Sequence, residues 1–408
     1  MTLSPAPVAE DVEVAIVGGG PAGACLAALL AAAGREVVLL ERAPSWRWRA
    51  CGVFSSPATV AALRRVGIEE AALDRATRPI PAMRVETPAG LPFRLAYGDD
   101  GSLAAPAVGF DRSALDPALL ELARARGANV REGVLARVVE IDVERGARSR
   151  LELRDGSGRE STLTARVVAG ADGRHSIVAA AAGVMRRAPL GDRVGLTYHV
   201  TDAVAEPHDA RMVIIDDGYV GLAPVPRGRL NVGIVLGRRW RSSLRSDGAR
   251  AVSERIERDL GLTLGAVAPQ RTDNLAGAAP LAVSVAHRAG PGWLVVGDAA
   301  GFLDPFTGEG LHRAVVSAEL AADAIDALLR GARSLAPYER AMTARFRSKD
   351  VVSLLVQGFL ARPALFGYAA RRLAGRPGVR ETMGLVMGDL VPASRAIDPR
   401  YLAALLRP

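Results

Sequence analysis

The sequence predicts an α/β (α+β) protein with three parts: a mixed-sheet domain with flanking helices, a domain built on an antiparallel sheet, and a helical C-terminal region. Three observations support this prediction. A strand, a glycine turn and a helix follow one another from residue 12, and the pattern recurs near residues 170 and 297. Apolar residues alternate between 193 and 236, which is typical of antiparallel strands. From Ser317 onward the apolar residues follow helical spacing.

The first glycine turn joins two strand signals through a helix. Residues 12–17 are apolar and β-branched, a helix rich in alanine and leucine follows to Ala33, and residues 36–40 form the next strand signal. The turn has G-x-G-x-x-G spacing, which lets a pyrophosphate approach the helix N-terminus. Glu41 ends the second strand and can accept hydrogen bonds from ribose hydroxyls. This unit therefore predicts a Rossmann-like, dinucleotide-binding domain. The turn residues are Gly18, Gly20, Pro21, Ala22 and Gly23.

Further residues are predicted to line the same site. An arginine beyond the adenine-ribose strand can reach a pyrophosphate, and Arg112 lies at the start of a predicted helix over residues 110–126, where a phosphate can bind. An ordinary surface role for Arg112 and a packing role for Cys51 remain alternatives. The predicted contacts in these segments are Arg42, Arg47, Cys51, Gly52, Arg112 and Val134.

The second glycine turn lies in the middle of the chain. Residues 165–169 form a buried strand signal that ends in Gly170-Ala171-Asp172-Gly173. Residues 78–108 are rich in proline and glycine, so we expect a strand-containing excursion from the nucleotide domain. Strands are also expected at 128–135, 137–143 and 150–154.

The second domain is predicted from short alternating strands. These are expected at 193–200, 211–215, 219–224 and 229–236, followed by one helix over 240–265 and a strand over 281–286.

The third glycine turn follows the strand signal 293–296. It runs from Gly297 to Gly310 and leads into a long helix, which we expect to break at Pro337, Pro363, Pro377 and Pro392. Glycines let the backbone approach a ligand, and backbone amides at a helix N-terminus suit an anionic or electron-accepting ring. Asp298 offers a carboxylate at the strand end.

Charge is distributed unevenly along the chain. The net charge is +8, and residues 331–408 alone carry 13 lysine and arginine residues against 5 acidic residues. A basic region favours nucleic acid, an anionic membrane surface or an acidic ligand, and a solvated, arginine-rich set of helices explains it as well. Aromatic residues make up 4% of the chain and no nucleic-acid-binding module is recognisable, so we expect no nucleic-acid partner.

Composition also limits the site chemistry and the setting. Lys349 is the single lysine, which excludes lysine chemistry at other positions, and two cysteines predict neither a disulfide framework nor a metal site. Glu10, Asp11 and Glu13 stand where a secretory signal carries positive charge. We therefore expect a cytoplasmic protein, with a peripheral membrane contact through the basic C-terminal region as an alternative.

The three turns, in this order, resemble the motifs of the flavoprotein hydroxylase and geranylgeranyl reductase superfamily, which shares the fold of para-hydroxybenzoate hydroxylase. The resemblance covers most of residues 12–330 and implies one bound FAD. It implies an FAD-binding domain formed by 1–77, 105–190 and 287–330, and a substrate domain formed by 78–104 and 191–286. Residues 331–408 remain as the C-terminal helical region. The matching residues of the second and third motifs are Asp172, Gly173, Gly297, Asp298, Pro305, Gly308 and Gly310.

The resemblance also implies individual roles. Glu41 holds the adenosine ribose, Arg47 and Arg112 lie near the pyrophosphate and ribityl chain, and Asp298 bonds a ribityl hydroxyl. The backbone amides of residues 310 and 311 face the flavin N1–C2=O edge, where a helix N-terminus stabilises negative charge. The full set of residues implied at this edge is Gly308, Glu309, Gly310 and Leu311.

Glu309 and His312 are the predicted acid–base candidates, because both lie beside the glycines expected to face the flavin. A helix-capping role for Glu309 and a structural role for His312 are the alternatives.

The resemblance predicts an FAD-dependent oxidoreductase, with NAD(P)H as the expected electron donor and an apolar or aromatic small-molecule substrate. Our first expectation is a monooxygenase that hydroxylates or oxidises a polyketide-like or lipid-like compound. The alternative is a geranylgeranyl-reductase-like enzyme that reduces C=C bonds, and Cys51-Gly52 and residues 307–310 resemble that branch. Gly221, however, stands where that branch often carries a tryptophan. Halogenation is disfavoured because the halogenase relatives need a lysine on an early strand. A membrane-surface lipid-binding flavoprotein is the hypothesis from another class.

Overall fold

The computed structural model of the chain describes residues 9–88, 92–97, 106–141, 148–188, 192–202, 204–261 and 270–407. Its largest sheet has eight strands, in the order β19-β20-β11-β1-β2-β8, with β10 paired to β11 and β9 paired to β10. From β20 to β8 neighbouring strands run parallel. The strands are β1 (Ala9–Val17), β2 (Val37–Glu41), β8 (Asn129–Glu132), β9 (Leu135–Glu140), β10 (Ser149–Arg154), β11 (Glu160–Gly170), β19 (Ala289–Gly290) and β20 (Trp293–Val295).

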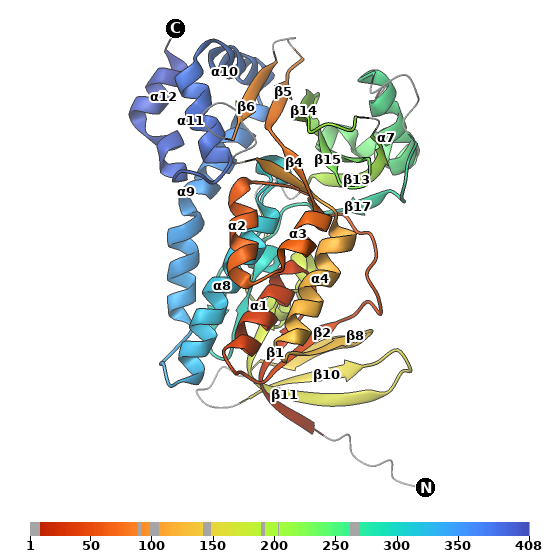
Figure 1. Cartoon of the computed structure of the whole chain (residues 1–408), viewed down its shortest axis with the longest axis vertical. Helices are drawn as coiled ribbons and strands as arrows, with labels where there is room; N and C mark the ends of the chain where they lie inside the picture. The colour runs from red at the N-terminus through yellow and green to blue at the C-terminus, as the bar shows by residue number, and fades with distance from the viewer. Residues whose placement is uncertain are drawn as a thin grey trace.

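Helices cover this sheet and close its core. α1 is apolar almost all round and nearly completely buried, since it packs between α4 and α8. Figure 1 shows these three helices side by side. The helices of this part are α1 (Pro21–Ala32), α2 (Pro57–Val66), α3 (Glu70–Ala76), α4 (Arg112–Ala125), α5 (Ile177–Ala181) and α8 (Gly310–Leu329).

A seven-stranded sheet forms the second layer, in the order β17-β13-β16-β15-β14-β5-β6. We expected it to be antiparallel, but β5 runs parallel to β14, because the long connection between these two strands permits a crossover. The strands are β5 (Ala82–Glu86), β6 (Phe93–Ala96), β13 (Val194–Thr201), β14 (Ala210–Ile215), β15 (Gly218–Val225), β16 (Arg229–Leu236) and β17 (Ala276–Ala278).

Two predictions in this part of the chain were wrong in detail. The single helix expected over 240–265 is two helices, α6 (Arg241–Ser246) and α7 (Gly248–Asp259), because Gly248 has a φ of 81° and breaks the helix. Residues 262–269 lie outside the described residues. The strand expected over 281–286 shrinks to β18 (Ser284–Val285), which pairs with β12 (Met185–Arg186). Part of the strand expected over 137–143 also lies outside the described residues.

A small three-stranded sheet connects the two large ones. Its order is β3 (Phe54–Ser55), β7 (Ala107–Phe110) and β4 (Thr77–Ile80). At this junction β7 approaches β15 so closely that a Cβ on Gly109 would lie 1.8 Å from the carbonyl oxygen of Pro224. Only glycine permits this contact between the two parts.

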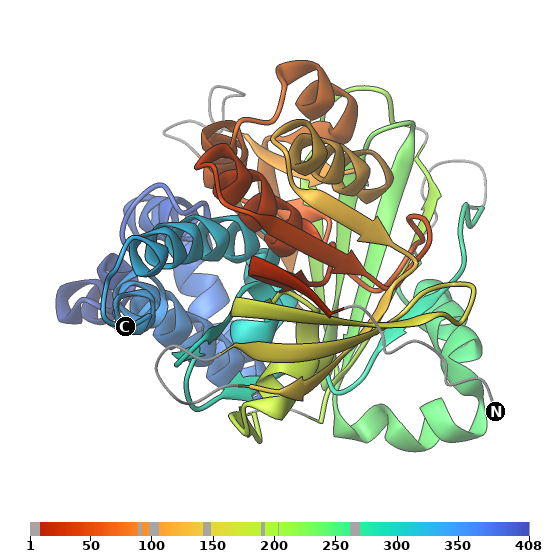
Figure 2. The same cartoon turned by 90° about the horizontal axis from the view of Figure 1, so that it is seen from below.

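The C-terminal region is helical, as expected, and its helices are α9 (Ala336–Leu360), α10 (Pro363–Gly375), α11 (Pro377–Met387) and α12 (Pro399–Leu406). Pro363 and Pro377 open helices, which confirms the breaks expected there. α9 runs beside α8 and carries α10–α12 to the side of β6, whereas α7 lies on the other side of the molecule (Figures 1 and 2).

Candidate functional site

The three glycine turns meet at the carboxyl edge of the parallel strands. β1, β11 and β20 are adjacent, so the turns that follow them lie together. A Cβ on Gly18 would lie 2.4 Å from the carbonyl oxygen of Ala171, and one on Gly297 would lie 2.9 Å from the Cβ of Ala22. Gly18 and Gly297 also have φ values of 107° and 58°, which favour glycine. Each turn is thus built against another.

Other glycines of these turns, and Gly52 in the loop after β2, face free space. Around Gly20, Gly52 and Gly173 nothing lies within 4 Å of the position that a Cβ would take. The chain therefore keeps backbone amides open beside the N-terminus of α1, where a pyrophosphate can approach. This arrangement of closely packed turns beside an open backbone fits the ADP portion of a dinucleotide.

Glu41 lies at the inner end of this space. Its carboxylate is buried and accepts hydrogen bonds from the amides of Gly19 at 2.8 Å and Ala43 at 2.9 Å. Val134 donates its amide to the carbonyl oxygen of Glu41 at 3.0 Å. A cavity with an empty volume of about 620 Å³ begins here and is lined by Gly19, Glu41 and Arg49, among others. The predicted residues Glu41 and Val134 are brought together, beside a space that suits an adenosine.

The structure separates the arginines that sequence reasoning grouped together. Arg42 and Arg47 are exposed, whereas Arg112 is buried and holds Asp116 with two hydrogen bonds of 2.6 and 2.9 Å. Arg112 also donates to the carbonyl oxygen of Gly52 at 3.2 Å, which fixes the loop that contains Cys51. Burial raises the pKa of the Cys51 thiol, against the opposing effect of Arg112.

The second and third turns each contain an aspartate. Asp172 accepts a hydrogen bond from the amide of Ile177 at 2.6 Å, and its other oxygen is buried without a partner among the described residues. Asp298 is half-buried, and burial raises the pKa of its carboxyl group against the effects of Arg174 and Arg112. Unused acceptor capacity at Asp172 fits a ligand that carries hydroxyl donors, as a ribityl chain does. Arg174 was missed, although it directly follows the Asp-Gly pair.

The loop before α8 is held by a buried polar network that the sequence did not reveal. The side chain of Asp304 accepts from the amide of Phe306 at 3.0 Å, from Arg193 at 2.8 Å and from the hydroxyl of Tyr219. Burial raises the pKa of the Asp304 carboxyl, and burial and Asp304 raise that of Tyr219. Gly308 then turns with a φ of 67° against the ring of Phe54.

Glu309 and His312, the predicted acid–base pair, lie in a separate buried ionic cluster. The Nζ of Lys349 lies 2.8 Å from Oε1 of Glu309 and 2.7 Å from Oδ1 of Asp389. It also donates a hydrogen bond to the carbonyl oxygen of Val386 at 2.7 Å. Burial lowers the pKa of His312, whose Nδ1 has no partner among the described residues.

Neither Glu309 nor His312 is among the residues lining the two cavities described here, so their catalytic role stays a prediction. Glu309 occupies the N-cap position of α8 without a capping hydrogen bond from its side chain.

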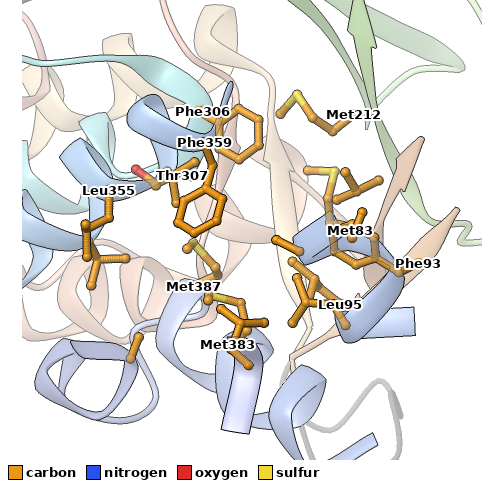
Figure 3. A pocket seen from close by; sticks show the side chains of 18 of the residues that line it. Met83, Phe93, Leu95, Met212, Phe306, Thr307, Leu355, Phe359, Met383 and Met387 are labelled. Carbon is orange, nitrogen blue, oxygen red and sulfur yellow. The ribbon is translucent and has the colours of Figure 1, made fainter. Parts of the chain in front are cut away.

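A large apolar cavity begins at the other end of the loop. It has an empty volume of about 970 Å³, part of it open to solvent, and lies between the seven-stranded sheet and the C-terminal helices (Figure 3). None of the described residues that line it is charged, and leucine, phenylalanine and methionine are the most frequent. Its lining is typified by Phe54, Met83, Phe93, Leu95, Met212, Phe306, Thr307, Leu355, Phe359, Met383 and Met387. Sequence reasoning missed this cavity because its walls come from distant segments.

Comparison with known proteins agrees with this geometry. A model of the FAD binding domain family matches residues 11–351. The menaquinone reductase of Mycolicibacterium smegmatis is 27% identical over 76% of this chain and 75% of its own. Digeranylgeranylglycerophospholipid reductase 2 of Methanopyrus kandleri is 30% identical over 78% of each chain. The crystal structure of a flavoprotein/dehydrogenase from Cytophaga hutchinsonii covers 95% of both chains with a TM-score of 0.82 at 18% identity.

The chain thus belongs to the FAD binding domain family, and its fold and site define a Rossmann-like flavoprotein. It is an FAD-dependent oxidoreductase, as the sequence motifs predicted.

Proposed function

We propose that this oxidoreductase saturates C=C bonds in the isoprenoid-like chain of a lipid. The observation that supports this proposal is the apolar cavity, which reaches Phe306 and Thr307 in the loop that leads to the N-terminus of α8. Moving a hydrocarbon chain from water into such a cavity is favourable by about 0.8 kcal/mol per CH₂ group. A charged or strongly polar ligand would lose its hydration there without compensation.

The names of the curated relatives support the same substrate class. Menaquinone reductase and digeranylgeranylglycerophospholipid reductase are both named for substrates with polyprenyl chains. Both relatives match this chain over about three-quarters of its length.

Different parts of the chain have different roles in the proposed reaction. FAD held in this site would supply a hydride once it had been reduced by NAD(P)H or another donor. Backbone amides at the N-terminus of α8 would stabilise negative charge that develops beside them, and the apolar walls exclude water from the cavity. The hydroxyl of Tyr219 donates a hydrogen bond to Asp304, and its ring packs edge-on against Phe306, with 5.1 Å between the ring centroids. We propose that this buried pair supplies the proton that must accompany the hydride.

The test is an anaerobic incubation of the reduced holoenzyme with prenyl lipids, followed by mass spectrometry. We expect products that have gained two hydrogen atoms per saturated bond. Replacing Ala370 by tryptophan would fill part of the cavity and should lower turnover of long chains about tenfold while FAD remains bound. Failure of the wild-type holoenzyme to saturate any prenyl chain would overturn the proposal.

Hydroxylation is the second candidate, and the position of Gly221 favours it. Gly221 pairs with Gly233 on the neighbouring strand, and Met212 is the nearest side chain to a Cβ built on it, at 3.7 Å. Two adjacent glycines leave room on this sheet for a ring where the reductase branch often carries a tryptophan. NADPH-dependent oxygen consumption that increases with an aromatic substrate, together with an oxygenated product, would support this candidate. Saturation of C=C bonds under anaerobic conditions, together with no substrate-stimulated oxygen consumption in air, would exclude it.

A further inference from the structure

Exposed apolar side chains are concentrated on the C-terminal helices. Nine large apolar residues are exposed in the described part of the chain, and six of them lie between residues 351 and 406. Three belong to the last half of α9: Val351, Leu354 and Leu355 are 38, 43 and 41% exposed. Leu365, at the start of α10, is 37% exposed. An apolar cluster of this kind is typical of a surface that binds a partner or a membrane.

The exposed residues follow one face of α9. Val351, Leu354 and Leu355 share this face at helical spacing, while Val352 and Gln357 on the opposite face are buried. Arg347 is exposed one turn earlier, and Arg362 is exposed at the bend that leads into α10. We call Arg347, Val351, Leu354, Leu355, Arg362 and Leu365 the α9–α10 surface.

The C-terminal region that contains this surface has a net positive charge. Residues 331–408 carry 13 basic and 5 acidic residues, and Lys349 is the buried member of this set, paired inside the protein. The surrounding arginines complement an anionic surface, while the apolar residues between them suit the acyl boundary of a bilayer.

The apolar cavity reaches this surface. Leu355 lines the cavity and is also 41% exposed, so one wall of the cavity is part of the molecular surface. Phe359, one turn further along α9, also lines the cavity. A hydrocarbon chain that leaves a bilayer at Leu355 would therefore pass from one apolar environment directly into another.

α9 and α10 each pack against the rest of the protein. Among the described residues no single helix is long and apolar enough to cross a bilayer. Taken together, α9 and α10 have the length and apolar composition of a membrane span, but a bend of 115° separates them. The opposite face of α9 is anchored in the core by Tyr338, Met342 and Phe346.

We propose that the α9–α10 surface docks on an anionic lipid membrane and that the apolar cavity is loaded through it. The docking stands on the exposed residues and charge alone. The loading rests on the proposed function, since it assumes a lipid substrate.

The docking is tested by co-flotation of the full-length holoenzyme with vesicles of phosphatidylcholine, with and without phosphatidylglycerol. We expect flotation with the anionic vesicles, and replacement of Val351 and Leu354 by glutamate should weaken it at least about tenfold. Replacing Arg347 and Arg362 by glutamine should weaken it roughly tenfold through lost charge. Leu135→Glu is the matched control, because Leu135 is 55% exposed on β9, far from this surface in the sequence, and should leave flotation unchanged.

Several outcomes would overturn the docking. These are the absence of flotation with anionic vesicles, equal flotation of the V351E/L354E variant and the wild type, or equal loss in the L135E control. Analytical sedimentation tests whether a second copy of the chain covers this surface instead of a membrane. A wild-type dimer that does not bind vesicles and that becomes a monomer in V351E/L354E would also contradict the proposal.

A separate measurement tests the loading. Turnover of a detergent-dispersed short prenyl substrate should be unchanged in V351E/L354E, while turnover of a vesicle-embedded substrate should fall in parallel with flotation. Flotation without any prenyl saturation would contradict the proposed function and leave the docking standing. Equal turnover of the vesicle-embedded substrate by both proteins would contradict the loading.

Discussion

Lys349 shows how one residue can join elements that are distant in the sequence. Its ammonium group connects Glu309 at the start of α8 with Asp389 after α11, and the second oxygen of Asp389 accepts a hydrogen bond from Ser56 at 2.9 Å. Asp389 has a φ of 57°, a backbone conformation that non-glycine residues rarely adopt, and the ion pair holds it there. The single lysine of the chain thus has a structural role that its sequence context did not indicate.

Replacing Lys349 by methionine should destabilise the protein by about 3–5 kcal/mol, because the carboxylates of Glu309 and Asp389, only 12 and 7% exposed, would lose the ammonium group that pairs with them. The measurement is urea unfolding of the holoenzyme. Lys349→Arg keeps the charge and should cost less. Arg340→Met is the matched control, since Arg340 is an exposed cation on the same helix, and should change the stability by at most about 0.5 kcal/mol. Equal effects of the two methionine variants would contradict the assigned role.

Two buried histidines predict how stability depends on pH. Burial lowers the pKa of His312 and of His199, and for His199 it outweighs the opposing effect of Asp273 at 2.5 Å. The native state therefore binds fewer protons than the unfolded state below the ordinary histidine pKa of about 6.5. The stability that comes from burying these histidines in the neutral form is fully present above that pH. As the pH falls below it, the free energy of unfolding decreases by at most about 1.4 kcal/mol per pH unit for each histidine.

Urea unfolding between about pH 5.5 and 7.5 measures this dependence, in a range above most carboxylate titrations. His312→Gln and His199→Gln should each reduce the slope. His287→Gln should leave it unchanged, because His287 is exposed. A wild-type stability that does not change across this range would contradict the prediction.

At the scale of elements, the glycine turns decide how closely helices and strands approach. A Cβ at position 18 would meet both the carbonyl oxygen of Ala171 and the Cα of Asp172, so the β1–α1 turn could not keep its place against the turn after β11. Gly34, at the other end of α1, has a φ of 76° but free space around its Cβ position. Replacing Gly34 therefore tests the energetic cost of the left-handed backbone alone, whereas replacing Gly18 tests that cost together with a steric clash.

Gly34→Ala should cost about 1–2 kcal/mol, the penalty for a left-handed conformation, and leave FAD affinity unchanged. Gly18→Ala adds the clash, so we expect a larger loss of stability and FAD binding at least about tenfold weaker. Flavin fluorescence titration of the apoprotein measures the affinity and urea unfolding the stability. Equal FAD affinities of the two variants would show that the packing of the turns does not shape the site.

At the scale of the whole molecule, the FAD site is assembled from parts that are remote in the sequence. The turns at residues 18, 172 and 298 meet only when β1, β11 and β20 lie in one sheet. A ligand that binds this edge therefore binds the native state alone and stabilises the entire fold.

Free FAD at a hundred times its dissociation constant should raise the unfolding free energy by about 2.7 kcal/mol. FMN should stabilise the protein less at the same concentration, because it lacks the adenosine that suits the space beside Glu41. Thermal unfolding of the apoprotein with each flavin measures both effects. Equal stabilisation by FMN and FAD would contradict the assignment of that space to adenosine.

Much of this architecture could be predicted because it is locally encoded. The strand–turn–helix units, the prolines that open α10 and α11, and the acid at the end of β2 are each set by residues within one short segment. The prediction of a single helix over 240–265 was wrong, since Gly248 ends one helix and begins another and helical spacing alone does not reveal this break. The pairing of β5 with β14 depends on a contact that no local pattern contains.

The sequence alone determined that the cofactor is a dinucleotide and set the order of the main elements, because glycine spacing and apolar periodicity act over a few residues; its resemblance to a known superfamily implied FAD. Only the tertiary structure decided which groups meet across the chain: Lys349 with Glu309, Asp304 with Tyr219, and the walls of the apolar cavity with one another. Burial and ion pairing depend on distances between segments that are tens to hundreds of residues apart in the sequence. The packing of those segments, and no local pattern, sets those distances.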